Sequence, residues 1–276
     1  MKSINAIKGT IITLVLTAAM SGLTGCTQKM SYVYKDSENY EAGEREITDK
    51  IENLDIDYIS GDVTIVSSKS DVATIVETAN KDLSDEMQVH TWLDGTTLRV
   101  RYCASGKGIE REINLNKKLT ITLPYDVLQK EVKLNLTSGD VTFSGIDVEN
   151  ATFDMTSGGL KIETDRIDNL VCDSTSGNRD IKVSKIDTLK IRATSGNIRM
   201  DFDTVPTNTS IDVTSGDITL FTTKDLDLSL DYDATSGKMS SDIPYTDNGD
   251  SYKFGDGTSQ MTIDATSGDL TIAAKD

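Results

Sequence analysis

The sequence has few basic residues and almost no histidine or cysteine. Its 276 residues include 28 Lys and Arg against 45 Asp and Glu, which gives a formal net charge of −17. A surface that binds nucleic acid needs clustered positive charge, so we predict no nucleic-acid partner. The single histidine, His90, and the three cysteines are too few for a His/Cys zinc cluster, and a Ser-His-Asp triad would depend on His90 alone. We therefore predict no catalytic residue, no metal site and no cofactor.

Aromatic, proline and apolar residues are also scarce. Aromatic residues make up 5% of the chain and hydrophobic residues 37%, and there are three prolines. This apolar content is low for one compact globule, but it suits a narrow core that is repeated along an axis. The low proline content argues against a disordered, linker-rich chain.

The start of the chain has the composition of a lipoprotein signal. Two lysines precede a mostly apolar run at residues 11–20, which is too short to span a membrane but suits the core of a signal peptide. The following Leu23-Thr24-Gly25-Cys26 resembles the bacterial lipobox, whose cysteine receives a diacylglycerol. We predict lipidation of Cys26, with a palmitate-type lipid anchor, and a location at the extracytoplasmic face of the bacterial cell membrane. An ordinary secretory signal that happens to contain a cysteine is the alternative.

The triplet Thr-Ser-Gly recurs along the second half of the chain. Successive triplets are 19, 19, 19, 20, 21 and 31 residues apart. A period near 20 residues is typical of a solenoid, in which each repeat forms one rung of a stack. The triplets begin at Thr137, Thr156, Thr175, Thr194, Thr214, Thr235 and Thr266.

Apolar residues flank each triplet with a period of two. A period of two indicates strands with one buried face, and glycine accepts positive φ angles, so the triplet predicts a corner between two strands. We therefore predict an all-β fold: a parallel β-helix or β-solenoid with rungs of about 19–21 residues. Three positions before each threonine stand Leu134, Phe153, Cys172, Ile191, Ile211, Tyr232 and Ile263. Six positions after it stand Phe143, Ile162, Ile181, Met200, Leu220, Ser241 and Ile272.

Segments upstream of the triplets extend this pattern. Residues 54–65 form an eighth, degenerate copy of the repeat, and Val89 to Tyr102 alternates around Leu93-Asp94-Gly95-Thr96, which predicts a β-hairpin. We predict four segments along the chain. They are a signal peptide at 1–25, a lipid-anchored tether at 26–44, an N-terminal β section at 45–135 that holds the first rung and the hairpin, and the repeat solenoid with a C-terminal cap at 136–276.

The interval between the last two triplets contains an aromatic insertion. Residues 242–257 include Tyr245, Tyr252 and Phe254. Solenoids need their open ends covered, so we interpret the insertion as a cap. An exposed contact site is the alternative.

Carboxylates recur at two positions of the repeat. In rungs stacked about 4.8 Å apart they form columns. We interpret both columns as solvated residues of the strand faces; Ca²⁺ binding is the alternative, because this ion takes several oxygen ligands. Two positions before the threonine, or its equivalent in the degenerate copy, stand Asp57, Asn135, Asp154, Asp173, Arg192, Asp212, Asp233 and Asp264. Three positions after it stand Asp62, Asp140, Gly159, Asn178, Asn197, Asp217, Lys238 and Asp269.

The sequence places an arginine in the predicted core, and it contains two cysteines besides Cys26. Arg179 occupies a position that the repeat assigns to the core, so either the register shifts locally or the arginine leaves the core at a bulge. Cys103 and Cys172 are interpreted as buried, inert thiols, and a disulfide between them is the alternative.

The repeated Thr-Ser-Gly-Asp-Val-Thr-Phe pattern, together with a strand that ends in Leu123-Pro124, resembles a bacterial family known as putative adhesins or toastrack domains. The resemblance covers about residues 50–276. It implies a β-solenoid outside the cell, without an established catalytic activity and without catalytic residues to transfer.

Sequence and resemblance together lead to one expected function and two alternatives. We expect a non-enzymatic cell-surface lipoprotein whose solenoid is a scaffold, adhesin-like or related to envelope stress. The expected partners are the membrane, through the lipid anchor, and cationic peptides, envelope proteins or glycans, because a strongly acidic chain attracts cationic molecules. The alternatives are a lyase or hydrolase that acts on extracellular polysaccharide, and a passive structural spacer.

Overall fold

A computed structural model describes residues 31–108, 115–249 and 251–275, and β-strands account for most of them. The strands of the N-terminal part are β1 (Ser31–Tyr32), β2 (Glu41–Ala42), β3 (Arg45–Ile47), β4 (Asn53–Ser60), β5 (Asp62–Ser68), β6 (Ala73–Ala79), β7 (His90–Asp94), β8 (Thr97–Arg101), β9 (Lys107–Gly108) and β10 (Lys117–Pro124). The repeats contain β11 (Gln129–Ser138), β12 (Val141–Ser144), β13 (Val148–Ser157), β14 (Leu160–Ser174), β15 (Arg179–Ser195), β16 (Ile198–Phe202), β17 (Asn208–Ser215), β18 (Ile218–Thr222), β19 (Leu228–Ser236), β20 (Met239–Ser241), β21 (Thr246–Asp247), β22 (Tyr252–Phe254), β23 (Ser259–Ser267) and β24 (Leu270–Ala274). Two 3₁₀ turns, η1 (Ser37–Asn39) and η2 (Asp85–Met87), complete the described elements.

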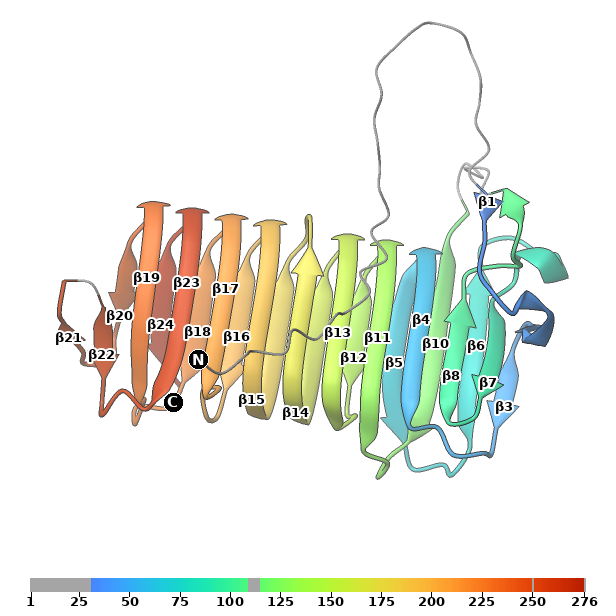
Figure 1. The fold of residues 1–276 in the computed structure, drawn as a ribbon, viewed down its shortest axis with the longest axis horizontal. Coiled ribbons are helices and arrows are strands. Elements are labelled where there is room, and N and C mark those ends of the chain that lie inside the picture. The colour runs from blue at the N-terminus through green and yellow to red at the C-terminus, as the bar shows by residue number, and fades with distance from the viewer. Residues whose placement is uncertain (1–30, 109–114, 250, 276) are drawn as a thin grey trace, which may run out of the picture.

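The strands form a flattened solenoid with two walls (Figure 1). We call one wall the front sheet, in the order β2-β7-β8-β4-β11-β13-β14-β15-β17-β23-β19-β22. The other wall, the back sheet, has the order β3-β6-β10-β5-β12-β14-β15-β16-β18-β24-β20. The strands β14 and β15 belong to both walls, because each continues from the back sheet into the front sheet.

The rungs stack in the register that the repeat predicts. Leu134 pairs with Ile56 on one side and with Phe153 on the other, and Phe153 pairs with Cys172. These inward side chains are at most 1% exposed, so one continuous apolar core runs between the two walls. The prediction of a parallel β-solenoid is confirmed.

The Thr-Ser-Gly triplets form the corners between the front and back sheets. The eight corner glycines, counting Gly61 of the degenerate copy, have φ between 111° and 159°. Each glycine also lies against the backbone of the neighbouring rung: a Cβ atom on Gly177 would be 1.9 Å from the carbonyl oxygen of Gly158. The corner therefore needs glycine both for its backbone angles and for the close approach of successive rungs.

The order of the rungs departs from the order of the chain at one end. The front strand of the seventh triplet, β23, lies between β17 and β19, and its back strand β24 lies between β18 and β20. The rung of Thr235 therefore closes the stack, although the rung of Thr266 follows it in the sequence (Figure 1). Both rungs carry the same alternation of inward and outward residues, which is why either one fits the register of its neighbours.

Residues 242–249 and 251–257 lie beside the terminal rung. Strands β21 and β22 pair with each other, and β22 runs antiparallel to β19 along Leu228–Leu230. Phe254 is 0% exposed and belongs to the core, whereas Tyr245 is 42% exposed. The insertion thus covers part of this end of the core and leaves an aromatic side chain at the surface.

The N-terminal β section covers the opposite end. The predicted hairpin is confirmed, since β7 and β8 pair antiparallel with Asp94 opposite Thr97. The prediction of a tether over 26–44 is wrong for residues 31–44: β1 pairs with β9, and β2 pairs with β7. The physical reason is the aromatic content of this segment, because the rings of Tyr34 and Tyr40 are 4.8 Å apart and the Tyr40 ring lies 5.6 Å from that of Trp92. The signal peptide, Cys26 and the start of the tether lie outside the described residues.

Candidate functional site

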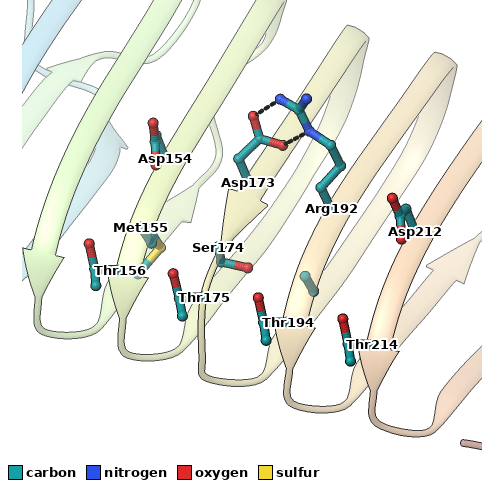
Figure 2. Close-up of a pocket in the computed structure, with 11 residues that line it drawn as sticks. Asp154, Met155, Thr156, Asp173, Ser174, Thr175, Arg192, Thr194, Asp212 and Thr214 are labelled. Atoms are coloured by element: carbon teal, nitrogen blue, oxygen red, sulfur yellow. Dashed lines mark hydrogen bonds and ion pairs between the residues drawn. The ribbon is translucent and has the colours of Figure 1, made fainter. Parts of the chain in front are cut away.

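The outer face of the front sheet carries two parallel rows of polar side chains. Strands β13, β14, β15 and β17 place Asp154, Asp173, Arg192 and Asp212 in one row, in direct register (Figure 2). The threonines of the corresponding triplets form the second row. We call this shallow, open hollow the acidic strip; its threonines are Thr156, Thr175, Thr194 and Thr214.

Arg192 neutralises part of the acidic strip. Its Nε donates to Asp173 Oδ1 at 2.6 Å, and its Nη2 donates to the other carboxylate oxygen. Asp154 has a pKa above its ordinary value, first because of partial desolvation and then because of the neighbouring Asp173 charge. The strip is therefore an exposed set of carboxylates, hydroxyls and one guanidinium at strand spacing, which suits hydrogen bonding to an extended polar or cationic ligand.

The second predicted column of carboxylates has a structural role. Asp140 Oδ1 accepts from the Gly159 amide at 2.7 Å, and Asn197 Oδ1 accepts from the Asp217 amide at 3.0 Å. The same bond links Asp217 to Asp269 and Asp269 to Lys238. Each side chain satisfies the first amide after the next corner, so the interpretation as merely solvated residues is incomplete. The sequence signal was present, because Asp or Asn directly follows most of the corner glycines.

The outer face of the back sheet alternates positive and negative charges. Lys182 is 3.1 Å from Glu163, and Arg199 is 3.7 Å from Asp180. The Arg199 guanidinium also lies 3.8 Å from the ring centroid of Phe221. Charges on this wall are paired between rungs, so it is closer to electrical balance than the acidic strip.

Arg179 stays at its inward position and is 2% exposed. Neither a register shift nor a bulge occurs, so both alternatives for Arg179 are wrong. Its Nη1 donates to the carbonyl oxygens of Gly177 and Ser195, and burial lowers the pKa of the guanidinium. The inward residues before this corner and the next one, Ser174 and Ala193, are small, which leaves volume for the long side chain.

A buried ion pair in the N-terminal section had no signal in the repeat pattern. Lys117 Nζ lies 2.8 Å from Glu77 Oε1, with both side chains at most 3% exposed. The ammonium also donates to the carbonyl oxygens of Met87 and Tyr102, and Glu77 accepts from Tyr58 and from the Val89 amide. The charges are thus paired and hydrogen-bonded within the core, where an unpaired charge is costly.

The remaining candidate residues are held in structural environments. His90 is half-buried on β7, with Nδ1 2.9 Å from the carbonyl oxygen of Gln88. Cys103 and Cys172 are free, buried thiols, so the interpretation as unpaired cysteines is confirmed. Burial raises the pKa of Cys103 to about 11 and that of Cys172 to about 12, which keeps both thiols protonated and unreactive.

Two features of the described residues concern metal and membrane binding. No group of three or more His, Cys, Asp or Glu side chains in this part of the chain is arranged to hold a metal ion. No helix among the described residues is long and apolar enough to span a membrane.

Comparison with known proteins gives one family match and several weak structural likenesses. The family model described as Toastrack DUF4097 matches residues 126–273. No curated protein matches the chain. A structure described as a putative cell adhesion protein from Clostridium sporogenes is 14% identical, covers 85% of this chain and 100% of its own, and has a TM-score of 0.39. A putative adhesin from Bacteroides fragilis is 11% identical over 84% of this chain and 96% of its own, with a TM-score of 0.35. A putative lipid binding protein from Parabacteroides distasonis is 14% identical over 86% of this chain and 97% of its own, with a TM-score of 0.40.

Proposed function

The chain belongs to the toastrack family, and on that premise we propose that it is a non-enzymatic surface lipoprotein whose solenoid is an adhesin-like binding scaffold. The observation that carries the proposal is the uninterrupted stack of in-register rungs between two differently built ends. Eight corner glycines follow one another along this stack. At a strand spacing of about 4.8 Å they span about 34 Å.

The position of the lipobox supports an anchored orientation. Ser31, five residues after Cys26, begins β1 at one end of the solenoid, and the terminal rung lies at the other end. Five extended residues reach at most about 18 Å. A lipid on Cys26 would therefore hold the N-terminal section near the membrane and leave the walls and the far end open to partners.

The charges favour partners that are cationic or rich in hydroxyl groups. The net charge of −17 attracts cationic molecules over distances of about a Debye length. The acidic strip offers carboxylates and threonine hydroxyls at regular spacing. We propose cationic peptides, envelope proteins and glycans as the classes of partner, with membrane contact through the anchor.

The anchoring part of the proposal is tested by Cys26→Ala in the full chain, expressed in a bacterium with a single membrane. We expect the parent protein to be labelled with radioactive palmitate and to sediment with membranes. The variant should lose the label, because it lacks the cysteine sulfur to which the diacylglycerol is attached.

Thr27→Ala is the matched control, since it alters the neighbouring residue and leaves the lipobox intact. Equal palmitate labelling of all three proteins would contradict lipidation at Cys26. The non-enzymatic part is tested separately with the purified protein: release of reducing sugar from acidic or neutral polysaccharides would contradict it.

A further inference from the structure

One end of the front sheet has an unpaired strand edge. On its outer side, β19 pairs with β22 only along Leu228–Leu230, and no described strand lies beside Asp231–Ser236 (Figure 1). In the back sheet, β20 (Met239–Ser241) pairs with β24 on one side, and no described strand lies on its other side. We call these two segments, Asp231–Ser236 and Met239–Ser241, the tip edge.

The core is also incompletely covered at the tip edge. Ile263 and Leu270 of the preceding rung are 0% exposed. The equivalent residues of the terminal rung, Tyr232 and Met239, are only partly buried, and so is Ala234. The Tyr232 hydroxyl donates to the Gly268 carbonyl at 2.8 Å, which holds the ring across the end of the core. A strand that docked here would gain apolar contact as well as backbone hydrogen bonds.

The inner side of β19 shows what such a strand looks like. Strand β23 runs parallel to β19 over its whole length, from Leu228 opposite Ser259 to Ser236 opposite Ser267. It reaches this place only after the chain has passed through the terminal rung and the insertion at 242–257. A segment separated from β19 by the rest of the terminal rung and by the insertion therefore docks on β19 in register.

Charge decides what kind of segment fits the outer side. Residues 223–258 contain eight aspartates and three lysines, and Asp231 and Asp233 lie exposed on the tip edge itself. The opposite end of the solenoid is acidic as well: residues 36–46 contain five acidic residues and one arginine. End-to-end stacking of two copies would bring like charges together, so the complementary occupant is a basic segment of another protein.

We propose that the tip edge binds an extended basic segment of a partner protein as an added strand parallel to β19. The inference rests on the proposed binding role and names the partner class and the place of contact. The alternating residues of the added strand that face the core would be small or apolar and would cover Tyr232 and Ala234. Its outward residues would be Lys or Arg and would lie beside Asp231 and Asp233.

The test uses the full chain in nonionic detergent and three fluorescent peptides. The first copies Ser259–Ser267 with the substitution Asp264→Lys, the second copies the segment unchanged, and the third is a scrambled form of the first. We expect the first to bind at least about tenfold more tightly than either of the others, because register and charge both contribute. Equal binding of the first and scrambled peptides would overturn the proposal, since it would reflect charge alone.

A pair of variants locates the contact. Asp233→Lys at the tip edge should weaken binding of the first peptide at least about tenfold. Asp212→Lys makes the same charge change in the same column of carboxylates, but on a strand that is paired on both sides. It should weaken binding less than about threefold. Equal weakening by both variants would place the peptide on the acidic strip and contradict the proposal.

Amide hydrogen exchange of the parent protein gives a readout that needs no variant. Bound peptide should slow exchange at Asp231–Ser236. Faster exchange at Ser259–Ser267 would show that the peptide displaces β23 and would also contradict edge binding. None of these readouts involves Cys26, so failure here is distinguishable from failure of the lipid anchor.

Discussion

Replacing Gly158 by alanine is expected to destabilise the protein by at least about 4 kcal/mol, near the upper end of single-residue effects. The φ angle of Gly158 is 117°, and a Cβ atom there would lie 1.9 Å from the Gly139 carbonyl oxygen. That oxygen belongs to the backbone of the neighbouring rung, so it cannot rotate away as a flexible side chain could. The corner must open, and the separation of the two rungs must increase. Urea denaturation followed by circular dichroism measures the loss.

Gly159, the next residue in the same corner, gives the matched control. It lies outside the left-handed region, and the nearest atom to its Cβ would be Asp140 Oδ1 at 3.3 Å, on a flexible side chain. Gly159→Ala should therefore change the free energy of unfolding by less than about 1 kcal/mol. Similar denaturation midpoints for the two variants would show that the corner does not depend on the close approach of successive glycines.

Removing the negative charge of Glu77 is expected to have the second-largest effect. Glu77→Gln keeps the shape and an acceptor for Tyr58 or the Val89 amide, but it leaves the Lys117 ammonium without its counter-charge inside the core. Breaking a buried pair in this way costs about 3–5 kcal/mol, because the remaining charge is desolvated. The measurement is again the free energy of unfolding in urea.

The control is the same substitution in an exposed pair. Glu163 is 3.1 Å from Lys182, and its side chain is 47% exposed. Glu163→Gln should cost less than about 1 kcal/mol, since water screens the pair and solvates the lysine that remains. If Glu77→Gln cost no more than Glu163→Gln, the Lys117–Glu77 pair would not be a buried charge network.

The fold within one rung is predictable from the sequence because it depends on residues that are close together in the chain. The alternation around each triplet decides which side chains face the core, as Leu134 and Phe153 show. The glycine of each triplet marks the corner, since its φ angle is closed to other residues. These signals repeat at a fixed interval, and each copy reinforces the assignment of the others.

The order of the last two rungs is not predictable in the same way. Ile263 and Tyr232 occupy equivalent positions, and each can follow Ile211 in register. The alternation therefore fixes the face of each strand but not its neighbour. The only hint in the sequence is the longer interval between the last two triplets, which contains the insertion at 242–257. This extra length fits either a loop that covers the end of the core or a return of the chain past the terminal rung.

The burial of charged residues in the core could not be predicted from the polarity of the sequence. Arg179 has the polarity of a surface residue, and only the small residues Ser174 and Ala193 before the adjoining corners indicate space for it inside. Lys117 and Glu77 are separated by 39 residues in a section without repeats, so no spacing relates them. The acidic strip, in contrast, follows directly from the repeat, because residues at one position of every rung share one column.

The central claim is that the rung of Thr235, and not that of Thr266, closes the stack and exposes the tip edge. Disulfide trapping tests it most directly, in the full chain with Cys26→Ala. Ser210 pairs with Thr262 on the outer face, and Thr262 pairs with Asp231, so Ser210 and Asp231 are two strand spacings apart. The Ser210–Thr262 separation is therefore about 4.8 Å and the Ser210–Asp231 separation about 9.6 Å, whereas a disulfide needs Cα atoms less than about 7 Å apart.

Mild oxidation should join the cysteines of Ser210→Cys/Thr262→Cys and leave Ser210→Cys/Asp231→Cys reduced, as read by mass spectrometry of the linked peptides. The opposite pattern would show that the rungs stack in chain order and would contradict the account.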